Sequence, residues 1–202
     1  MYIRWKGLGF VVFIILVEVF VINGVEASLY RCLEKRKVQE IQDLQTVQSV
    51  VEEISCFPIP ISHRHQVSYQ NDFGASRGSG VHEGCDIMSN VNEAGVIPIV
   101  SATDGVITNL GWLYLGGYRV GITSKNGNYY YYAHFDSYSK RLKVGEEVQA
   151  GEFLGFMGCT GEGEEGTSGK FPVHLHFGIY VTDKDGTEKA VNPYHYLTKI
   201  ND

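Results

Sequence analysis

From Phe57 onward, the chain is a succession of short apolar or aromatic runs separated by glycine-containing turns. Runs of this length favour β-strands joined by tight turns over helices. The abundance of glycine (24 residues) and tyrosine (13 residues) fits the same pattern. The clearest hairpin is expected at Asn126-Gly127, between predicted strands 118–123 and 129–134, because both turn residues can adopt positive φ. The sequence therefore predicts a mainly β domain built from an antiparallel sheet.

The N-terminus has a different pattern. Residues 8–22 form an almost unbroken apolar run, which Arg4 and Lys6 precede. Its length fits the core of a signal peptide better than a membrane span. An uncleaved anchor stays open, because the flanking Lys and Arg residues give no clear orientation. Residues 1–27 are therefore interpreted as a signal peptide or membrane anchor. Either alternative predicts an extracytoplasmic protein, secreted or anchored to the cell membrane.

A helix is predicted over residues 33–54, where apolar side chains recur every three or four positions without Gly or Pro. Pro58 and Pro60 end it, since proline cannot continue a helix and restrains the residue before it. We therefore expect a helical spacer over residues 28–56 and the folded domain over residues 57–202.

The charge and the cysteine count exclude some classes of function. The net charge is −6, and no basic stripe interleaved with aromatic residues is visible, so nucleic acid is not expected as a partner. Cys32, Cys56, Cys85 and Cys159 are too few for a disulfide scaffold in a domain this large. An exported chain with four cysteines permits disulfides without requiring them.

His174 and His176 are the first candidates for a metal site. They alternate with Leu175 and Phe177, which is strand periodicity, so both imidazoles are expected on one face of a strand. Two imidazoles on one face can both bind a metal, or one can bind while the other handles protons. A lone His-x-His is more often a surface pair, and His63 with the same spacing to His65 is interpreted as such a pair.

Two further segments carry candidate ligands. His82 and Asp86 combine an imidazole with a carboxylate, and both groups suit Zn²⁺. His134 is expected at the end of an aromatic strand. Taken alone, a spacing like that of His82 and Asp86 occurs by chance in most proteins. A lone histidine in the position of His134 would be expected to bond to the backbone. Cys85 is a possible thiolate ligand, but strand alternation with Asp86 favours packing in the core.

In this order, the three segments resemble the site motifs of the lysostaphin/LytM-type zinc metallopeptidases. The resemblance covers roughly residues 68–197 and implies the antiparallel β fold called the duplicated hybrid motif. The matching motifs are His82-x-x-x-Asp86, Tyr132-x-His134 and His174-Leu175-His176-Phe177, together with an opening turn at 71–77 and framework segments at 104–107, 144–155, 158–161 and 191–193. Gly178 and Cys85 depart from the usual pattern, but neither is a proposed ligand.

The resemblance implies one Zn²⁺ bound by His82, Asp86 and His176, with His134 and His174 as catalytic residues. Three protein ligands leave a fourth position open for water, as in catalytic zinc sites. Zinc would lower the pKa of that water and polarise the scissile carbonyl. One free histidine would take a proton while the other stabilises the oxyanion, and we assign the base to His174 and the oxyanion to His134.

The implied function is an exported zinc metalloendopeptidase that hydrolyses stem or bridge peptides of bacterial peptidoglycan. The alternative is a non-catalytic LytM-like module that binds or activates another cell-wall hydrolase or envelope protein. The filled ligand set favours catalysis, and five metal-competent residues exceed the need of a purely structural zinc site. The membrane is a partner only if the N-terminal segment is retained. The acidic loop 161–170 is interpreted either as a solvated turn or as one wall of a substrate groove that favours amine-bearing peptides.

Overall fold

A computed structural model of the protein describes residues 28–38, 40, 45, 47–78, 80–182 and 186–201. The chain divides into two compact units, Met1–Val47 and Gln48–Asp202. The described residues between 28 and 53 are helical, which agrees with the predicted helix. The predicted signal peptide or anchor, residues 1–27, lies outside the described residues. Among the residues described, no helix combines the length and apolar character needed to cross a membrane.

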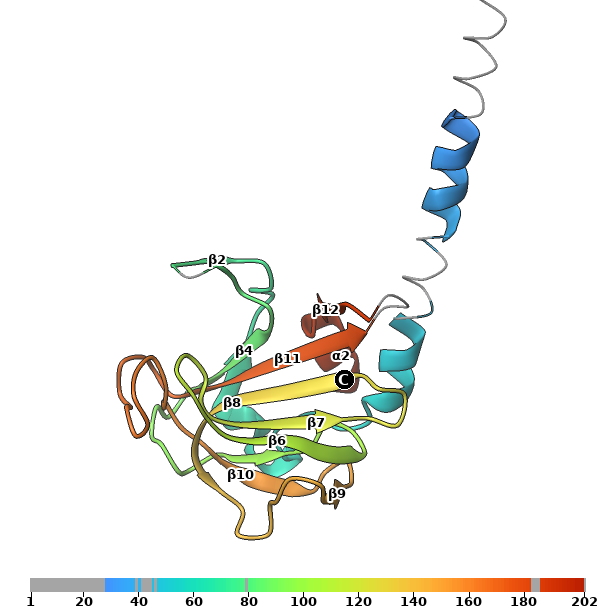
Figure 1. The fold of residues 1–202 in the computed structure, drawn as a ribbon. Helices are drawn as coiled ribbons and strands as arrows, with labels where there is room; N and C mark the ends of the chain where they lie inside the picture. Colours follow the sequence, from blue (N-terminus) through green and yellow to red (C-terminus); the bar gives the residue numbers. More distant parts are fainter. Residues whose placement is uncertain are drawn as a thin grey trace, which may run out of the picture. The chain divides into compact units, whose positions relative to one another are not determined.

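An antiparallel sheet of ten strands forms the second unit (Figure 1). The strands are β1 (Val67–Tyr69), β4 (Cys85–Ser89), β5 (Pro98–Val100), β6 (Gly105–Leu113), β7 (Gly117–Thr123), β8 (Tyr129–Tyr138), β9 (Glu147–Val148), β10 (Phe153–Met157), β11 (His174–Thr182) and β12 (Glu188–Val191). Their order is β1-β4-β11-β8-β7-β6-β9, while β10 pairs with β5 and β8, and β12 pairs with β11. The predicted mainly β, antiparallel fold is confirmed.

Four smaller elements complete this unit. β2 (Ser76–Arg77) and β3 (Gly80–Val81) form a separate two-stranded sheet. A 3-10 helix, η1 (Ile61–Gln66), precedes β1, and the helix α2 (Tyr194–Asn201) follows β12. The pair His63 and His65 lies in η1.

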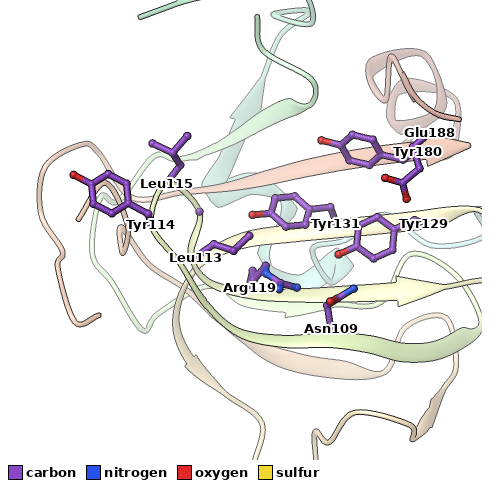
Figure 2. Close-up of a pocket in the computed structure, with 10 residues that line it drawn as sticks. Asn109, Leu113, Tyr114, Leu115, Arg119, Tyr129, Tyr131, Tyr180 and Glu188 are labelled. Carbon is purple, nitrogen blue, oxygen red and sulfur yellow. The ribbon is translucent and has the colours of Figure 1, made fainter. Parts of the chain in front are cut away.

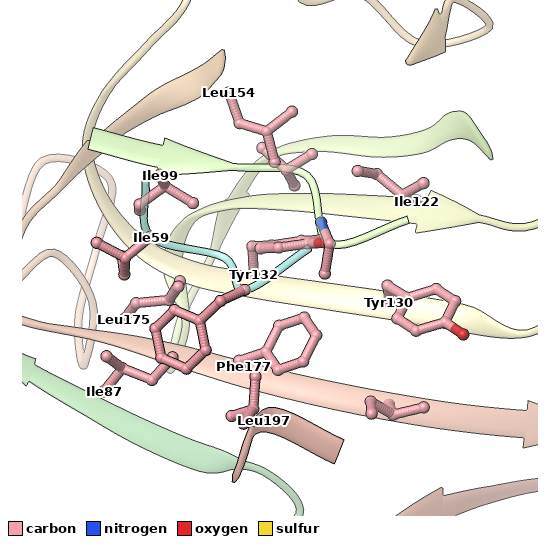
Figure 3. Packing of buried hydrophobic residues seen from close by; sticks show 14 of the residues in the cluster. Ile59, Ile87, Ile99, Ile122, Tyr130, Tyr132, Leu154, Leu175, Phe177 and Leu197 are labelled. Carbon is pink, nitrogen blue, oxygen red and sulfur yellow. The ribbon is translucent and has the colours of Figure 1, made fainter. Parts of the chain in front are cut away.

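The hydrophobic core lies against one face of the sheet, where side chains of neighbouring strands interlock (Figure 3). Ile87 of β4, Leu175 and Phe177 of β11, and Tyr130 and Tyr132 of β8 are fully buried there. Because side chains alternate along a strand, the residues between these ones project from the opposite face. The two histidines of β11 therefore lie on the face away from the core.

The last turn of the N-terminal helix packs into the same core, since Val50 and Ile54 are buried there. Glu53 adds polar contacts to the β7–β8 hairpin. Its carboxylate accepts hydrogen bonds from Ser124 Oγ (2.7 Å), Asn128 Nδ2 (2.7 Å), Tyr130 Oη (2.9 Å) and the Asn126 amide (3.2 Å). The end of the helix is thereby fixed to the sheet.

The predicted hairpin at Asn126-Gly127 is present and joins β7 to β8. Its turn differs in detail from the expectation. Gly127 has a positive φ of 86°, whereas Asn126 is not among the described residues with positive φ. The Ser124 amide donates to the Asn128 carbonyl (2.9 Å), so the loop is longer than the two-residue turn expected.

Candidate metal centre and catalytic cleft

The pairing of β4 with β11 assembles the first part of the site. In this antiparallel pair, Asp86 is directly opposite His176. Both side chains project from the face away from the core, because their neighbours Ile87 and Leu175 are buried. His82 lies between β3 and β4 and reaches the same point. Strand register therefore places the carboxylate beside one imidazole, and the preceding segment supplies the second.

Three potential ligand atoms form a compact triangle. His82 Nε2 lies 2.9 Å from His176 Nδ1 and 3.0 Å from Asp86 Oδ1, and the last two atoms are 3.1 Å apart. In a tetrahedral zinc site with bonds of about 2.0–2.1 Å, ligand atoms are about 3.3 Å apart. The triangle and its N, N, O donor set therefore fit one Zn²⁺. No other group of this kind occurs among the residues that the structure describes.

Groups behind the ligands orient them. His82 Nδ1 lies 3.1 Å from the Asp72 backbone carbonyl, and because a carbonyl only accepts, Nδ1 carries the proton and Nε2 is free to bind a metal. Arg77 Nη2 donates to Asp86 Oδ2 at 2.6 Å, which leaves Oδ1 facing the two histidines. Burial favours the neutral form of Asp86, but hydrogen bonds with His176 and His82 outweigh it and hold the pKa of Asp86 well below its usual range.

Gly84 makes room for the His176 ring. A Cβ atom at this position would lie 2.5 Å from His176 Cε1 and 2.6 Å from His176 Nε2. Those separations are far below van der Waals contact, so any side chain here would displace the ring. The glycine between His82 and Asp86 is therefore required by the position of the third candidate ligand.

His134 lies in a bulge of β8 and has a positive φ of 67°. The register between β7 and β8 shifts beside it, between Tyr118 and Val120. The expectation that the strand ends at His134 is wrong, because β8 continues to Tyr138. A bulge bends the strand and changes the direction of a side chain without ending the pairing. Here it turns His134 toward the candidate metal centre.

His134 and His174 face each other with ring centroids 4.6 Å apart. His134 Nδ1 bonds to the Thr160 carbonyl (2.7 Å), and His174 Nδ1 bonds to the Pro172 carbonyl (2.8 Å). Burial, together with the charge of His174, lowers the pKa of His134 to about 3, and burial also lowers the pKa of His174. Both rings are therefore neutral at neutral pH, with a proton on Nδ1 and a free Nε2.

The family profile of peptidase family M23 matches residues 80–193, a segment that contains all five of these residues. The chain belongs to peptidase family M23. This membership confirms the predicted resemblance to lysostaphin/LytM-type peptidases.

Several M23 relatives are similar over the same region. An L-Ala–D-Glu endopeptidase of Bacillus subtilis (strain 168) is 40% identical over 144 residues, which cover 70% of this chain and 42% of the relative. Lysostaphin of Staphylococcus simulans is 28% identical over 127 residues, which cover 57% of this chain and 23% of the relative. The chain thus spans less than half the length of these curated relatives.

A crystal structure from Ruminococcus gnavus ATCC 29149, assigned as a glycyl-glycine endopeptidase lytM, has 47% sequence identity and a TM-score of 0.68. The similarity covers 74% of this chain and 61% of that one. The catalytic domain of lysostaphin, with a TM-score of 0.52 and 24% identity, agrees in fold alone. Membership of M23 and these endopeptidase relatives support a peptidase.

The M23 site lies in a cleft of about 380 Å³. Glu162 of the acidic loop lines this cleft, so the loop forms part of its wall. The loop is held in place by Trp112 Nε1, which donates to the Gly163 carbonyl (3.1 Å), and by Lys170, whose ammonium group contacts the Glu162 carbonyl. The position of the loop therefore agrees with the interpretation as a wall of the groove. Selection of amine-bearing peptides by its charge stays a prediction.

Other residues singled out in the sequence lie outside the group of candidate ligands. Cys85 is fully buried, as expected, and its Sγ faces the Gln70 carbonyl at 3.4 Å. Burial, with the charges of Asp72 and Asp86, raises the pKa of Cys85 to about 12. A neutral, buried thiol is a packing group and not a ligand. All four cysteines are free thiols.

Sequence reasoning missed several residues that support the M23 site. Asp72 and Arg77 contact the candidate ligands, although both lie in the opening turn that carried part of the resemblance. Thr160 and Pro172 orient His134 and His174 through backbone carbonyls, which leave no signal in a sequence. Phe171 packs edge-on against His134 at a centroid distance of 4.7 Å.

Proposed function

We propose that the chain is a zinc-dependent endopeptidase that hydrolyses peptide bonds of bacterial cell-wall peptidoglycan outside the cytoplasm. The observation that carries the proposal is the triangle of His82, Asp86 and His176 with the two neutral histidines beside it. Membership of family M23 and the endopeptidase relatives support it. The name of the Bacillus relative specifies a bond to a D-amino acid, and D-amino acids are typical of cell-wall peptides.

His82 through Nε2, Asp86 through Oδ1 and His176 through Nδ1 would hold the zinc ion. When bound, zinc supplies a Lewis acid that activates water and polarises the scissile carbonyl at neutral pH. Arg77 keeps the second oxygen of Asp86 turned away from this position. The protein residues therefore fix a single ligand geometry before the metal arrives.

His174 is suited to accept the proton from the attacking water. Its free Nε2 lies 3.8 Å from Asp86 Oδ1, so it faces the ligand set, and its lowered pKa keeps this atom unprotonated. The Pro172 carbonyl on Nδ1 stabilises the ring once Nε2 gains the proton. His134 has the same tautomer, so it can donate a hydrogen bond to an oxyanion only after its own Nε2 is protonated.

The competing function is a non-catalytic module that binds or activates another cell-wall hydrolase. The complete ligand set and the neutral histidines support catalysis, because a binding module needs neither a proton acceptor nor an open metal position. We further propose that residues 1–27 direct export as a signal peptide or anchor, that residues 28–56 act as a spacer, and that the peptidase domain follows.

The test is mass spectrometry of fragments that the zinc-loaded protein releases from purified peptidoglycan, with and without a zinc chelator. We expect chelator-sensitive release of fragments with new peptide ends, which would also identify the bond. His176→Ala should lose zinc and activity together, because it removes a ligand. His174→Ala should keep zinc and lose turnover by about a hundredfold or more, because it removes the proton acceptor.

His63→Ala is the matched control, since His63 lies in η1 and is not part of the ligand cluster. This variant should keep both zinc and activity. Tightly bound zinc without any released fragment, from peptidoglycans of several cross-link types, would favour the non-catalytic module.

A further inference from the structure

A second cavity of about 570 Å³ adjoins the metal cleft (Figure 2). Leu115, Gly116, Tyr131 and Tyr180 line both cavities. A peptide bound across the metal centre can therefore extend into the second cavity without leaving the protein surface. The additional lining includes one basic side chain, Arg119 of β7, on the floor of the hollow.

Two glycines make room for the tyrosines that wall this hollow. A Cβ atom at Gly121 would lie 2.1 Å from the Tyr129 hydroxyl, and one at Gly116 would lie 2.2 Å from the Tyr131 hydroxyl. The two tyrosines of β8 thus occupy space that side chains on the neighbouring segment would otherwise fill. The aromatic rings of these tyrosines therefore line the hollow near Arg119, and their hydroxyl groups make its edge polar.

Arg119 has no acidic partner in the described part of the protein. The ion pairs found there involve other residues, and the buried Nε atom of Arg119 makes no hydrogen bond. Burial raises the pKa of Tyr131 and of Tyr129, so neither hydroxyl supplies a negative charge at neutral pH. Glu188 lines the same cavity, but it is exposed and not within ion-pair distance of Arg119.

We propose that Arg119 binds a free carboxylate of the substrate peptide close to the bond that is cut. A guanidinium is always charged, and its planar fork matches a carboxylate in a two-point contact. A partly buried charge without an acidic partner is unfavourable, so an anion that enters the hollow gains a strong interaction. Arg119 is thus a specificity-determining residue. This inference rests on the proposed peptidase function.

The test uses two synthetic peptidoglycan stem peptides that differ at one group. In the first, the glutamate residue next to the scissile bond carries a free carboxylate, and in the second this group is a carboxamide. The zinc-loaded wild type should cleave the acid with a kcat/KM about tenfold to a hundredfold higher than the amide, mostly through KM, because charge-assisted hydrogen bonds have that strength.

Arg119→Gln should remove the preference for the acid, so that kcat/KM for the acid falls to that for the amide in the same variant. Arg119→Lys, which keeps the charge without the fork, should retain part of the preference. Lys125→Gln is the matched control, because it removes an exposed positive charge from the β7–β8 turn, away from the cavity. Zinc content and circular dichroism verify that each variant is folded.

Equal cleavage of acid and amide by the wild type would overturn the inference while leaving the peptidase proposal intact. The inference is also overturned if Arg119→Gln weakens cleavage of both peptides equally. Failure of the zinc-loaded wild type to cleave either peptide or whole peptidoglycan would instead refute the proposed function, and this inference with it.

Discussion

Three histidines of the cleft each donate their Nδ1 proton to a backbone carbonyl. His82 uses Asp72, His134 uses Thr160 and His174 uses Pro172. The main chain thereby selects one tautomer for each ring and turns Nε2 of each toward the cleft. A backbone carbonyl cannot be replaced by a point mutation, so this selection is resistant to most single substitutions. A substitution that adds atoms next to a ring can still displace that ring.

Gly84→Ala tests that space. The added methyl group would overlap the His176 ring, so we expect zinc affinity to fall by about tenfold to a hundredfold, as for the loss of groups that support metal ligands. Gly78→Ala is the control, because no atom lies within 4 Å of its Cβ position. Competition with a chromogenic zinc chelator measures both variants. An unchanged affinity in Gly84→Ala would mean that His176 is not a ligand in this orientation.

The depressed pKa of His134 predicts a pH effect on the metal-free protein. This pKa is about 3 in the folded state and 6.5 in the reference state, so between these values the unfolded chain binds a proton that the folded protein does not. The contribution of His134 to stability is therefore full above pH 6.5 and declines as the pH falls toward 3.

Urea unfolding of the metal-free protein at about pH 7.5 and about pH 5.0 measures how much the free energy of unfolding changes. His134→Asn is a suitable variant because asparagine tolerates positive φ. The loss of unfolding free energy between the two pH values should be smaller in the variant than in the wild type. A loss of equal size would show that His134 is not the titrating group.

The side chains of the candidate site could be predicted from the sequence, whereas their supports could not. Alternation along 174–177 placed two histidines on one face, and the structure has them there. Asp72 and Arg77 reach the site only through the conformation of the turn between β1 and β4, which no periodicity describes. The bulge at His134 depends on hydrogen bonds with Gly116 and Gly158, two distant glycines that carry no pairing signal.

Among the secondary-structure elements, the end of the N-terminal helix contacts the sheet. Glu53 receives four hydrogen bonds from the β7–β8 hairpin, and the same hairpin continues into the strand that carries His134. The helix therefore supports the strand on which one catalytic candidate lies.

Glu53→Ala should lower the free energy of unfolding by roughly 2–3 kcal/mol, because it leaves several partly buried donors without an acceptor. Glu52→Ala is the matched control. Glu52 is exposed and bonds only to Gln48 one turn earlier, so its removal should change stability by less than about 0.5 kcal/mol. Denaturant titration distinguishes the two, and equal effects would contradict an anchoring role for Glu53.

For the molecule as a whole, the compact unit begins at Gln48. A fragment covering residues 48–202 should therefore fold and bind zinc. A fragment that begins at Ser55 lacks Val50, Ile54 and Glu53, and it should be less stable by about 3–5 kcal/mol from the lost apolar burial alone. Thermal unfolding of the two fragments measures the difference. Equal melting temperatures would place the start of the folding unit after the helix.

The class of the fold followed from the short runs and turns, but the order of the strands did not. Alternation identifies which residues of a strand face the core, yet it does not identify the neighbouring strand. β4 and β11 are far apart in the chain and still pair in a register that sets Asp86 against His176. In the sequence, only the resemblance to a known family indicated that Asp86 and His176 come together.

The acidic loop lies between Thr160 and Pro172, whose carbonyls bind Nδ1 of His134 and His174. Thr160 has contacts outside the loop, because its hydroxyl donates to the Phe135 carbonyl (2.7 Å) and accepts from the Tyr118 amide (3.1 Å). At the other end, the Val173 amide donates to the side chain of Asn92 (2.8 Å). Both ends of the loop are therefore also held by residues outside it. We therefore expect that a different segment grafted between these two ends reshapes the wall of the cleft while His134 and His174 keep their positions.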